Sequence, residues 1–193
     1  MIQNKISRLL NYLGFSFKDL RVRPSIKFMK ERNRRKLKCI EIGTLYGDNA
    51  LNMLKNLDIA EIFCIDPYLD YSDYKEDFAH NVVEKAEFIA KDKLRKYSLK
   101  VKFVKEFSDK AAKKFKNGQF DFIYVDGNHS YKYVKKDLEL YYPKLKNNGV
   151  LAGDDIGWEG VSRAVCEFIA KHKEVKLIID EPDWIIINPA FLK

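Results

Sequence analysis

The feature that most constrains the fold is a regular alternation of strand-like and helix-like segments that begins at residue 37. Short apolar runs rich in β-branched and aromatic residues predict strands at 37–42, 61–65, 101–104, 120–125 and 149–152. Helical spacing of apolar residues predicts helices between and after them, at about 48–57, 76–96, 108–115, 130–141 and 159–171. Strands that alternate with helices form a parallel sheet covered on both faces. The alternation therefore predicts an α/β fold.

The end of the chain departs from this alternation. Two strand-like runs, at 175–179 and 184–187, are separated only by Asp180-Glu-Pro-Asp183. This connection is too short for a crossover helix, so we expect the two strands to pair antiparallel as a hairpin. The whole is then a Rossmann-like, seven-stranded, mostly parallel sheet with an antiparallel last strand.

Residues 1–36 precede the alternation and are predicted to form a basic N-terminal helical extension to a main domain at 37–193. Apolar residues recur at helical spacing over 2–13, and Pro24 suits the first turn of a helix that runs to about Arg35. The first 40 residues hold twelve Lys or Arg and two acidic residues, a net charge of +10, whereas the remainder holds 24 basic and 26 acidic residues. Such an arm either meets an anionic partner or is a solvated surface, and the sequence leaves both open.

Composition indicates an ordinary globular protein. The chain is 46% hydrophobic and 33% charged, and no apolar run approaches the roughly 18 residues that cross a bilayer. Lys5 and Arg8 interrupt the first apolar residues, so no signal-peptide pattern is seen and we expect a cytoplasmic location. The three cysteines lack metal-ligand spacing, and two lie inside strand-like runs, which indicates core thiols. A homodimer is compatible with this composition.

A glycine turn follows the first predicted strand, in Cys39-Ile-Glu-Ile-Gly-Thr-Leu-Tyr-Gly-Asp48. Gly43 lets the backbone approach a ligand, Gly47 allows a tight entry into the helix, and Asp48 is the expected N-cap. Leu45 replaces the middle glycine of a dinucleotide fingerprint, which makes a bound pyrophosphate less expected.

Two carboxylates near this turn favour a ligand over a purely structural turn. Asp66 ends the next strand, where it would accept hydrogen bonds from ribose hydroxyls. Glu41 would hold a cationic or amino group of the same ligand, or else the loop backbone. In the structural alternative, the glycines only form the turn and Asp66 only ends the strand.

Four motifs resemble those of class I S-adenosylmethionine-dependent methyltransferases: Glu-Ile-Gly-Thr-Leu-Tyr-Gly-Asp, Ile-Asp-Pro-Tyr, Asp-Phe-Ile-Tyr-Val-Asp-Gly-Asn-His-Ser-Tyr and Gly-Val-Leu-Ala-Gly-Asp-Asp. They are most similar to the metal-dependent O-methyltransferases of the catechol, caffeoyl-CoA and macrolide-sugar type, over about residues 37–188. That fold has an antiparallel seventh strand. The resemblance implies a cofactor site in which Glu41, Gly43, Thr44 and Gly47 border the methionine moiety, Asp66 takes the ribose, and Ser108 and Asp126 lie near the adenine and sulfonium ends.

Three carboxylates follow two neighbouring strands. Asp126 ends one strand, and Asp154 and Asp155 end the other, so we expect the three to converge. Mg²⁺ takes oxygen ligands, and it would lower the pKa of an acceptor hydroxyl and orient a vicinal diol. In the metal-dependent relatives the equivalent positions hold the metal. The alternative is a turn at Asp126 and an N-cap at Asp155, although no Lys or Arg within either motif neutralises the carboxylates.

His129 lies three residues after Asp126 and is suited to proton removal near neutral pH. In catechol-type relatives a lysine base occupies a similar offset, and some sugar enzymes use an acidic residue one position earlier. That position is Asn128 here, which cannot act as a base. His129 is thus the candidate base, with Asp126 as its catalytic partner, or it only orients the helix that begins at Ser130.

The sequence therefore predicts an S-adenosylmethionine-dependent O-methyltransferase, Mg²⁺-assisted, that acts on a hydroxyl of a small molecule or saccharide. Trp158, just after the paired aspartates, is a candidate for the acceptor wall. One alternative is an RNA methyltransferase that grips phosphates with the basic arm, although no Asn-Pro-Pro-Tyr base-flipping motif occurs. Another is a cofactor-binding module without catalysis.

Overall fold

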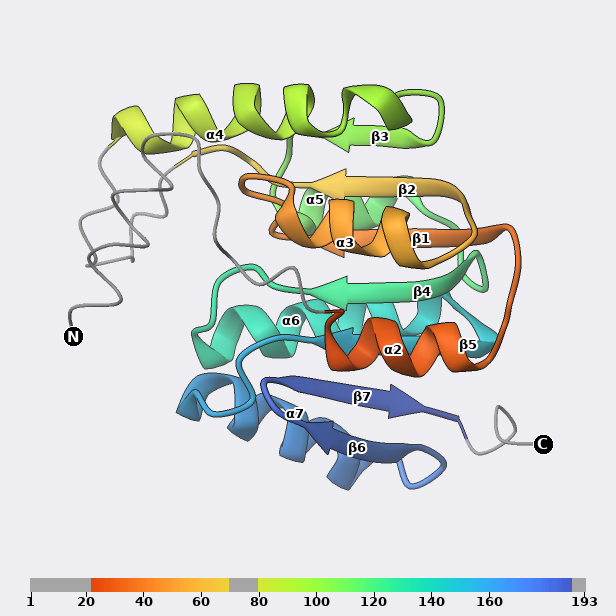
Figure 1. The fold of residues 1–193 in the computed structure, drawn as a ribbon. Helices are drawn as coiled ribbons and strands as arrows, with labels where there is room; N and C mark the ends of the chain where they lie inside the picture. Colours follow the sequence, from red (N-terminus) through yellow and green to blue (C-terminus); the bar gives the residue numbers. More distant parts are fainter. Residues whose placement is uncertain (1–21, 70–79, 189–193) are drawn as a thin grey trace.

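The computed structural model describes residues 22–69 and 80–188, and these residues form a sheet of seven strands in the order β3-β2-β1-β4-β5-β7-β6 (Figure 1). The strands are β1 (Leu37–Ile42), β2 (Ile59–Ile65), β3 (Val101–Val104), β4 (Phe120–Val125), β5 (Leu145–Gly153), β6 (Lys176–Asp180) and β7 (Asp183–Ile187). Strands β1 to β5 pair in parallel, and β7 runs antiparallel to both β5 and β6. The predicted mostly parallel sheet with a reversed last strand is confirmed.

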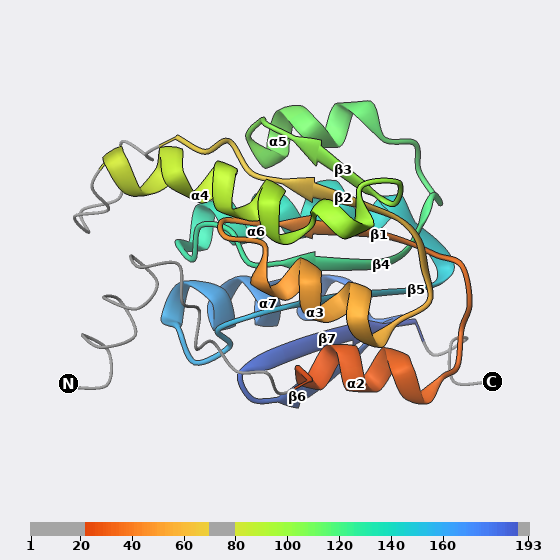
Figure 2. The same cartoon turned by 45° about the horizontal axis from the view of Figure 1, so that its top comes forward.

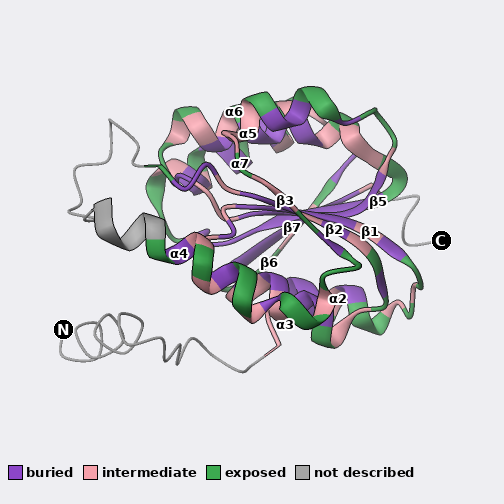
Figure 3. Cartoon of the chain, turned by 90° about the horizontal axis from the view of Figure 1, so that it is seen from above, coloured by how far each residue is buried: buried purple, intermediate pink, exposed green. Residues whose placement is uncertain are grey.

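Helices cover both faces of the sheet, as the views in Figures 2 and 3 show. One face carries α2 (Pro24–Glu31), α3 (Asp48–Asn56) and α4 (His80–Lys93), and the other carries α5 (Ser108–Ala111), α6 (Tyr131–Tyr141) and α7 (Glu159–Lys171). Short 3-10 turns follow α4, α5 and α6, at Arg95–Tyr97, Ala112–Lys114 and Tyr142–Lys144. The predicted helix over 2–13 and the first residues of the predicted helix over 76–96 lie outside the described residues.

The apolar core lies on the two faces of the sheet. β4 and β7 are buried along their whole length, as expected for central strands covered by helices on both sides. On the α6 side, Val134, Leu138 and Tyr141 pack into the core. On the α2 side the core includes Cys39 and Cys64, the two cysteines expected to be core thiols.

Several element boundaries differ from the prediction, and three of them have a clear local description. β5 begins at Leu145, four residues before the predicted start. The polar residues after Leu145 give no hydrophobic strand pattern, but they belong to the strand, which pairs with β4 through an irregular register. Helix α2 ends at Glu31, and Asn33 then takes a positive φ of 47°. The N-cap of α3 is Gly47 in the left-handed conformation, while Asp48 is the first helical residue and pairs with Lys93 at 2.6 Å. None of the helices in the described residues has the length and apolarity that crossing a membrane requires.

Candidate active site

The predicted site residues lie at the edge of the sheet where the parallel strands end. The carboxyl ends of β1, β2 and β4 point to the same side of the molecule (Figure 1). Ligands of open α/β sheets bind outside these carboxyl ends, near the point where the strand order reverses. Here the order reverses between β1 and β4, so the turns after these two strands frame the candidate site.

Gly43 brings the turn after β1 into direct contact with the segment after β4. Its φ is +85°, and a Cβ atom at this position would lie 1.9 Å from the backbone oxygen of Asp126. The amide of Asp126 also donates to the carbonyl of Ile42 at 2.8 Å. Only glycine fits such an approach, so the predicted cofactor turn and Asp126 are held side by side.

Glu41 is buried beneath this turn, with 1% of its surface exposed. Its Oε1 accepts a hydrogen bond from Asn49 Nδ2 at 3.0 Å, whereas Oε2 is buried without a partner among the described residues. Burial raises the pKa of Glu41 to about 8, and the charges of Asp126 and Asp66 add to the shift. The hydroxyl of Tyr68 is likewise buried without a partner. Buried polar atoms are normally paired, so these atoms fit the polar groups of a ligand.

Asp66 ties the first two turns together. Its Oδ2 accepts the amide of Leu45 at 2.9 Å, and its Oδ1 accepts the amide of Tyr68 at 2.8 Å. Burial raises the pKa of Asp66, and these two amides act in the opposite direction. Each carboxylate oxygen can accept more than one hydrogen bond, so both remain able to receive a ribose hydroxyl. Thr44 is buried in the same turn, which Gly47 closes.

Ser108, predicted near the adenine, forms hydrogen bonds with helix α6. Its Oγ donates to Asp137 Oδ1 at 2.5 Å, and its backbone oxygen accepts from the Tyr141 hydroxyl at 2.7 Å. Burial raises the pKa of Asp137 to about 7. Asp137 was missed in the sequence because one carboxylate inside an amphipathic helix gives no sign that it points inward.

His129 lies between two of the predicted carboxylates. Its Nε2 is 3.6 Å from Asp126 Oδ1 and 3.4 Å from Asp155 Oδ2, and 19% of its side chain is exposed. Burial alone would lower its pKa, but the interactions with Asp126, Asp155 and Asp154 outweigh burial and raise it. The indole of Trp158 lies 5.3 Å from the imidazole, centroid to centroid. The side chain of Asn128 is used differently from that of His129, because its Oδ1 accepts a hydrogen bond from the amide of Ser130 at 2.9 Å.

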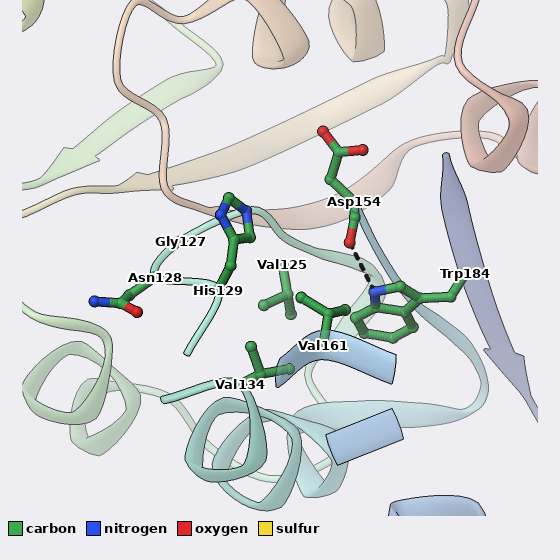
Figure 4. A pocket seen from close by; sticks show the side chains of 8 residues that line it. All are labelled: Val125, Gly127, Asn128, His129, Val134, Asp154, Val161 and Trp184. Atoms are coloured by element: carbon green, nitrogen blue, oxygen red, sulfur yellow. Dashed lines mark hydrogen bonds between the residues drawn. The ribbon is translucent and has the colours of Figure 1, made fainter. Parts of the chain in front are cut away.

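A small pocket lies between His129 and Trp184, and Figure 4 shows the residues that line it. The apolar side chains of Val125, Val134 and Val161 line it, and the indole of Trp184 donates to the backbone oxygen of Asp154 at 3.1 Å. Helix α7 closes one side, because a Cβ atom on Gly160 would lie 2.4 Å from the backbone oxygen of His129. The first turn of α7 therefore fixes the backbone of His129.

Asp154 is directed away from this pocket, toward a cation that the sequence did not predict. Its side chain forms an ion pair with Arg23, and its Oδ1 accepts the amide of Asp155 at 2.8 Å. Arg23 also pairs with Asp183 at 2.8 Å. Burial alone would lower the pKa of Arg23, but Tyr124, Asp183 and Asp154 raise it, so the guanidinium stays charged.

The predicted cluster of three metal-binding carboxylates is therefore not formed. Asp126 and Asp155 lie next to His129, whereas Asp154 forms an ion pair with Arg23. Over 22–69 and 80–188, no group of three or more His, Cys, Asp or Glu side chains is arranged to hold a metal ion. The sequence analysis considered cations only within the two motifs, whereas Arg23 approaches Asp154 from a distant part of the chain. Metal binding by these three carboxylates stays a prediction.

Comparisons with known proteins agree with this fold. A family model described as a methyltransferase domain matches residues 40–156. Uncharacterized protein R132 of Acanthamoeba polyphaga mimivirus is 30% identical over 121 residues, which are 60% of this chain and 50% of the viral protein. The chain thus spans about half the length of this curated relative.

Two solved structures share the fold at low sequence identity. The O-methyltransferase from Bacillus cereus in complex with SAH has a TM-score of 0.62 at 16% identity, over 95% of this chain and 88% of that one. The MycE methyltransferase from the mycinamycin biosynthetic pathway, in complex with Mg and SAH, has a TM-score of 0.54 at 16% identity, over 85% of this chain and 44% of that one.

The family match covers more than half of the sequence and includes the turns after β1, β2 and β4 that frame the site. The chain therefore belongs to the methyltransferase domain family, and its sheet is that of the class I S-adenosylmethionine-dependent methyltransferases.

Proposed function

We propose that this chain is an S-adenosylmethionine-dependent O-methyltransferase that acts on a hydroxyl of a small molecule or saccharide. The observation that carries the proposal is the position of His129, between Asp126 and Asp155 and beside the glycine turn that contacts Asp126. A proton acceptor next to a cofactor turn is what methyl transfer to a hydroxyl requires, because a hydroxyl is a poor nucleophile at neutral pH.

The buried polar atoms of the first two turns fit the cofactor. Glu41 Oε2 and the Tyr68 hydroxyl offer partners for its polar groups, and the Asp66 oxygens suit the ribose. The residues proposed to border the cofactor are Glu41, Gly43, Thr44, Gly47, Asp66, Ser108 and Asp126. When bound, S-adenosylmethionine supplies a methyl group on a sulfonium centre.

In this proposal His129 removes the proton of the acceptor hydroxyl. Asp126 and Asp155 orient the imidazole and stabilise its protonated form, as carboxylates do for a histidine base. Trp158, half exposed next to His129, is placed to form part of the acceptor wall. The expected Mg²⁺ assistance is not part of the proposal, because the Asp154 carboxylate is already paired with Arg23. The Mg of MycE is a property of that protein.

The RNA alternative draws on the basic arm, and the described part of that arm gives it little support. Residues 22–40 contain eight Lys or Arg, and three of these pair with carboxylates of the sheet domain. They are Arg23, Arg34 and Lys38. A cytoplasmic location, a homodimer and a domain boundary at residue 36 stay predictions.

Methyl transfer can be tested with the full chain and S-adenosylmethionine labelled on its methyl group. We expect label on the hydroxyl oxygen of at least one member of a panel of small hydroxyl compounds and saccharides. The His129→Gln variant should lose about 10²- to 10⁴-fold in turnover while it still binds the cofactor. His172→Gln is the matched control, because His172 lies beyond α7 and pairs with Glu174.

Two results would contradict the proposal. Label on RNA, with none on the small acceptors, would favour the alternative acceptor class. Cofactor binding without turnover across the whole panel would indicate a binding module.

A further inference from the structure

The strongest unassigned feature of the molecule is the buried network around Arg23. This residue is the N-cap of α2 and precedes Pro24, so its backbone is held at the first turn of the helix. It reaches across to two carboxylates, Asp154 after β5 and Asp183 at the start of β7. Its guanidinium also lies 5.3 Å from the centre of the Tyr124 ring. The network therefore joins α2, β4, β5 and β7.

Asp183 holds the guanidinium in place. This carboxylate is fully buried, with 0% exposed, and both of its oxygens are saturated. Oδ1 accepts from Arg23 Nε at 3.1 Å, Arg23 Nη2 at 2.8 Å and the Tyr124 hydroxyl at 2.9 Å. Oδ2 accepts from the amide and the hydroxyl of Ser25, at 2.9 and 2.5 Å. Moving Arg23 away would leave a buried charge with only neutral donors, which is strongly unfavourable.

Asp154 is the carboxylate for which a metal ion would have to compete. It is 8% exposed, and the guanidinium that neutralises it is fixed by Asp183. A divalent cation at Asp154 would face the positive charge of Arg23 at contact distance. Repulsion between like charges in a poorly solvated site opposes such binding.

We propose that Arg23 is a positioning residue that replaces the divalent cation at Asp154, so that this site works without metal. The guanidinium neutralises Asp154, fixes the end of β5 that bears Asp155, and leaves Asp155 to contact His129. The inference rests on the proposed methyl transfer for its functional meaning. Its structural part, that Arg23 excludes a cation from Asp154, is independent of that function.

The test is a Mn²⁺ titration of the full chain followed by electron paramagnetic resonance. We expect the wild type to show no saturable Mn²⁺ site that depends on Asp154, so that Asp154→Asn leaves the titration unchanged. The double variant Arg23→Ala/Asp183→Asn removes the guanidinium together with the carboxylate that it would leave unpaired. This variant should bind Mn²⁺ at least about tenfold more tightly than any residual binding by the wild type, because the Asp154 carboxylate is then no longer paired with a cation.

Two matched variants separate the charge of Arg23 from a general effect on stability. Arg23→Lys/Asp183→Asn keeps a cation beside Asp154 and should behave as the wild type does in the Mn²⁺ titration. Arg34→Ala breaks a different guanidinium pair, with Asp121 at 2.6 Å, and should also leave the titration unchanged. Circular dichroism of each variant confirms that it is folded.

Saturable Mn²⁺ binding by the wild type that is lost in Asp154→Asn would overturn the proposal. Equal Mn²⁺ affinity in the wild type and a folded Arg23→Ala/Asp183→Asn variant would overturn it as well. S-adenosylmethionine binding is measured on the same samples in EDTA. A failure to bind the cofactor would count against the proposed function only, because the comparison between wild type and Asp154→Asn does not need the cofactor.

Discussion

Asp126 is the residue at which the glycine turn after β1 and the candidate base meet. Its backbone contacts Gly43, and its carboxylate faces His129 at 3.6 Å. Asp155 approaches the same imidazole from the other strand, at 3.4 Å. Two carboxylates around one histidine orient the imidazole and stabilise its protonated form.

A second buried carboxylate, Asp137, gives a prediction about stability and pH. Burial raises its pKa from 3.8 to about 7, so the folded protein keeps this proton while the unfolded chain loses it near pH 4. The stability that the protonated form contributes is present below about pH 4 and is lost as the pH rises toward 7. Asp137→Asn should therefore gain stability relative to the wild type between pH 5 and 7, by roughly 1–3 kcal/mol.

Urea unfolding at several pH values measures this difference. Asp109→Asn is the control, because Lys136 holds the pKa of the Asp109 carboxylate below its usual value. Its difference from the wild type should stay constant between pH 5 and 7. A constant difference for Asp137→Asn over the same range would show that Asp137 is already charged in the folded protein.

Contacts between residues could be predicted where both residues lie within one motif. They could not be predicted where the residues come from distant segments of the chain. Asp126 and His129 are three residues apart, so their proximity follows from one turn. Arg23 and Asp183 meet only because α2 packs against β7, and no local pattern contains that information. The ion pair of Asp154 with Arg23 could not be predicted for the same reason.

At the scale of elements, the first turn of α7 supports the segment that carries His129. Gly160 lies against the backbone of that segment, with room for no side chain: a Cβ atom would be 2.4 Å from the oxygen of His129 and 2.8 Å from the amide nitrogen of Tyr131. Both atoms belong to backbone, which cannot move aside as a flexible side chain can. α7 therefore sets the position of the candidate base.

Gly160→Ala should displace the His129 segment and lower turnover, with a loss of about 1–3 kcal/mol in the free energy of unfolding. Gly157→Ala is a matched control three residues earlier, because a Cβ atom at Gly157 meets nothing within 4 Å. Turnover and urea unfolding of both variants check this expectation. Wild-type turnover in Gly160→Ala would mean that the position of His129 does not depend on α7.

The order and type of the described elements follow from sequence periodicity, and their ends do not. The apolar runs of β6 and β7 and the short connection between them were enough to predict a reversed last strand. The start of β5 was missed because strand pairing there uses backbone hydrogen bonds and exposed polar side chains. The N-cap of α3 was misplaced by one residue, because Gly47 takes the left-handed conformation.

At the scale of the whole molecule, helix α2 is part of the core and not only a basic surface. Ile26 and Met29 are buried with residues of β1, β2 and β7, while Lys27 and Lys30 remain exposed. The basic residues of this helix and the core beneath it thus occupy different faces. Arg23 adds a polar link between the helix and the candidate site.

Ile26→Ala should therefore destabilise the whole fold, by about 2–5 kcal/mol, because it leaves a cavity between α2 and the sheet. Lys27→Ala, at the exposed neighbouring position, should change the free energy of unfolding by less than about 0.5 kcal/mol. Urea unfolding monitored by both tryptophan fluorescence and circular dichroism measures the effect. An Ile26→Ala variant as stable as Lys27→Ala would indicate that α2 is a separable extension.

Cofactor binding tests the central claim most directly. Calorimetric titration of the full chain with S-adenosylmethionine, in EDTA, should show a single saturable site. Asp66→Asn should weaken that site by roughly 10- to 100-fold, because it removes a charged hydrogen-bond acceptor. The exposed Asp92→Asn should leave it unchanged. Absence of saturable binding by the folded wild-type protein would contradict the account.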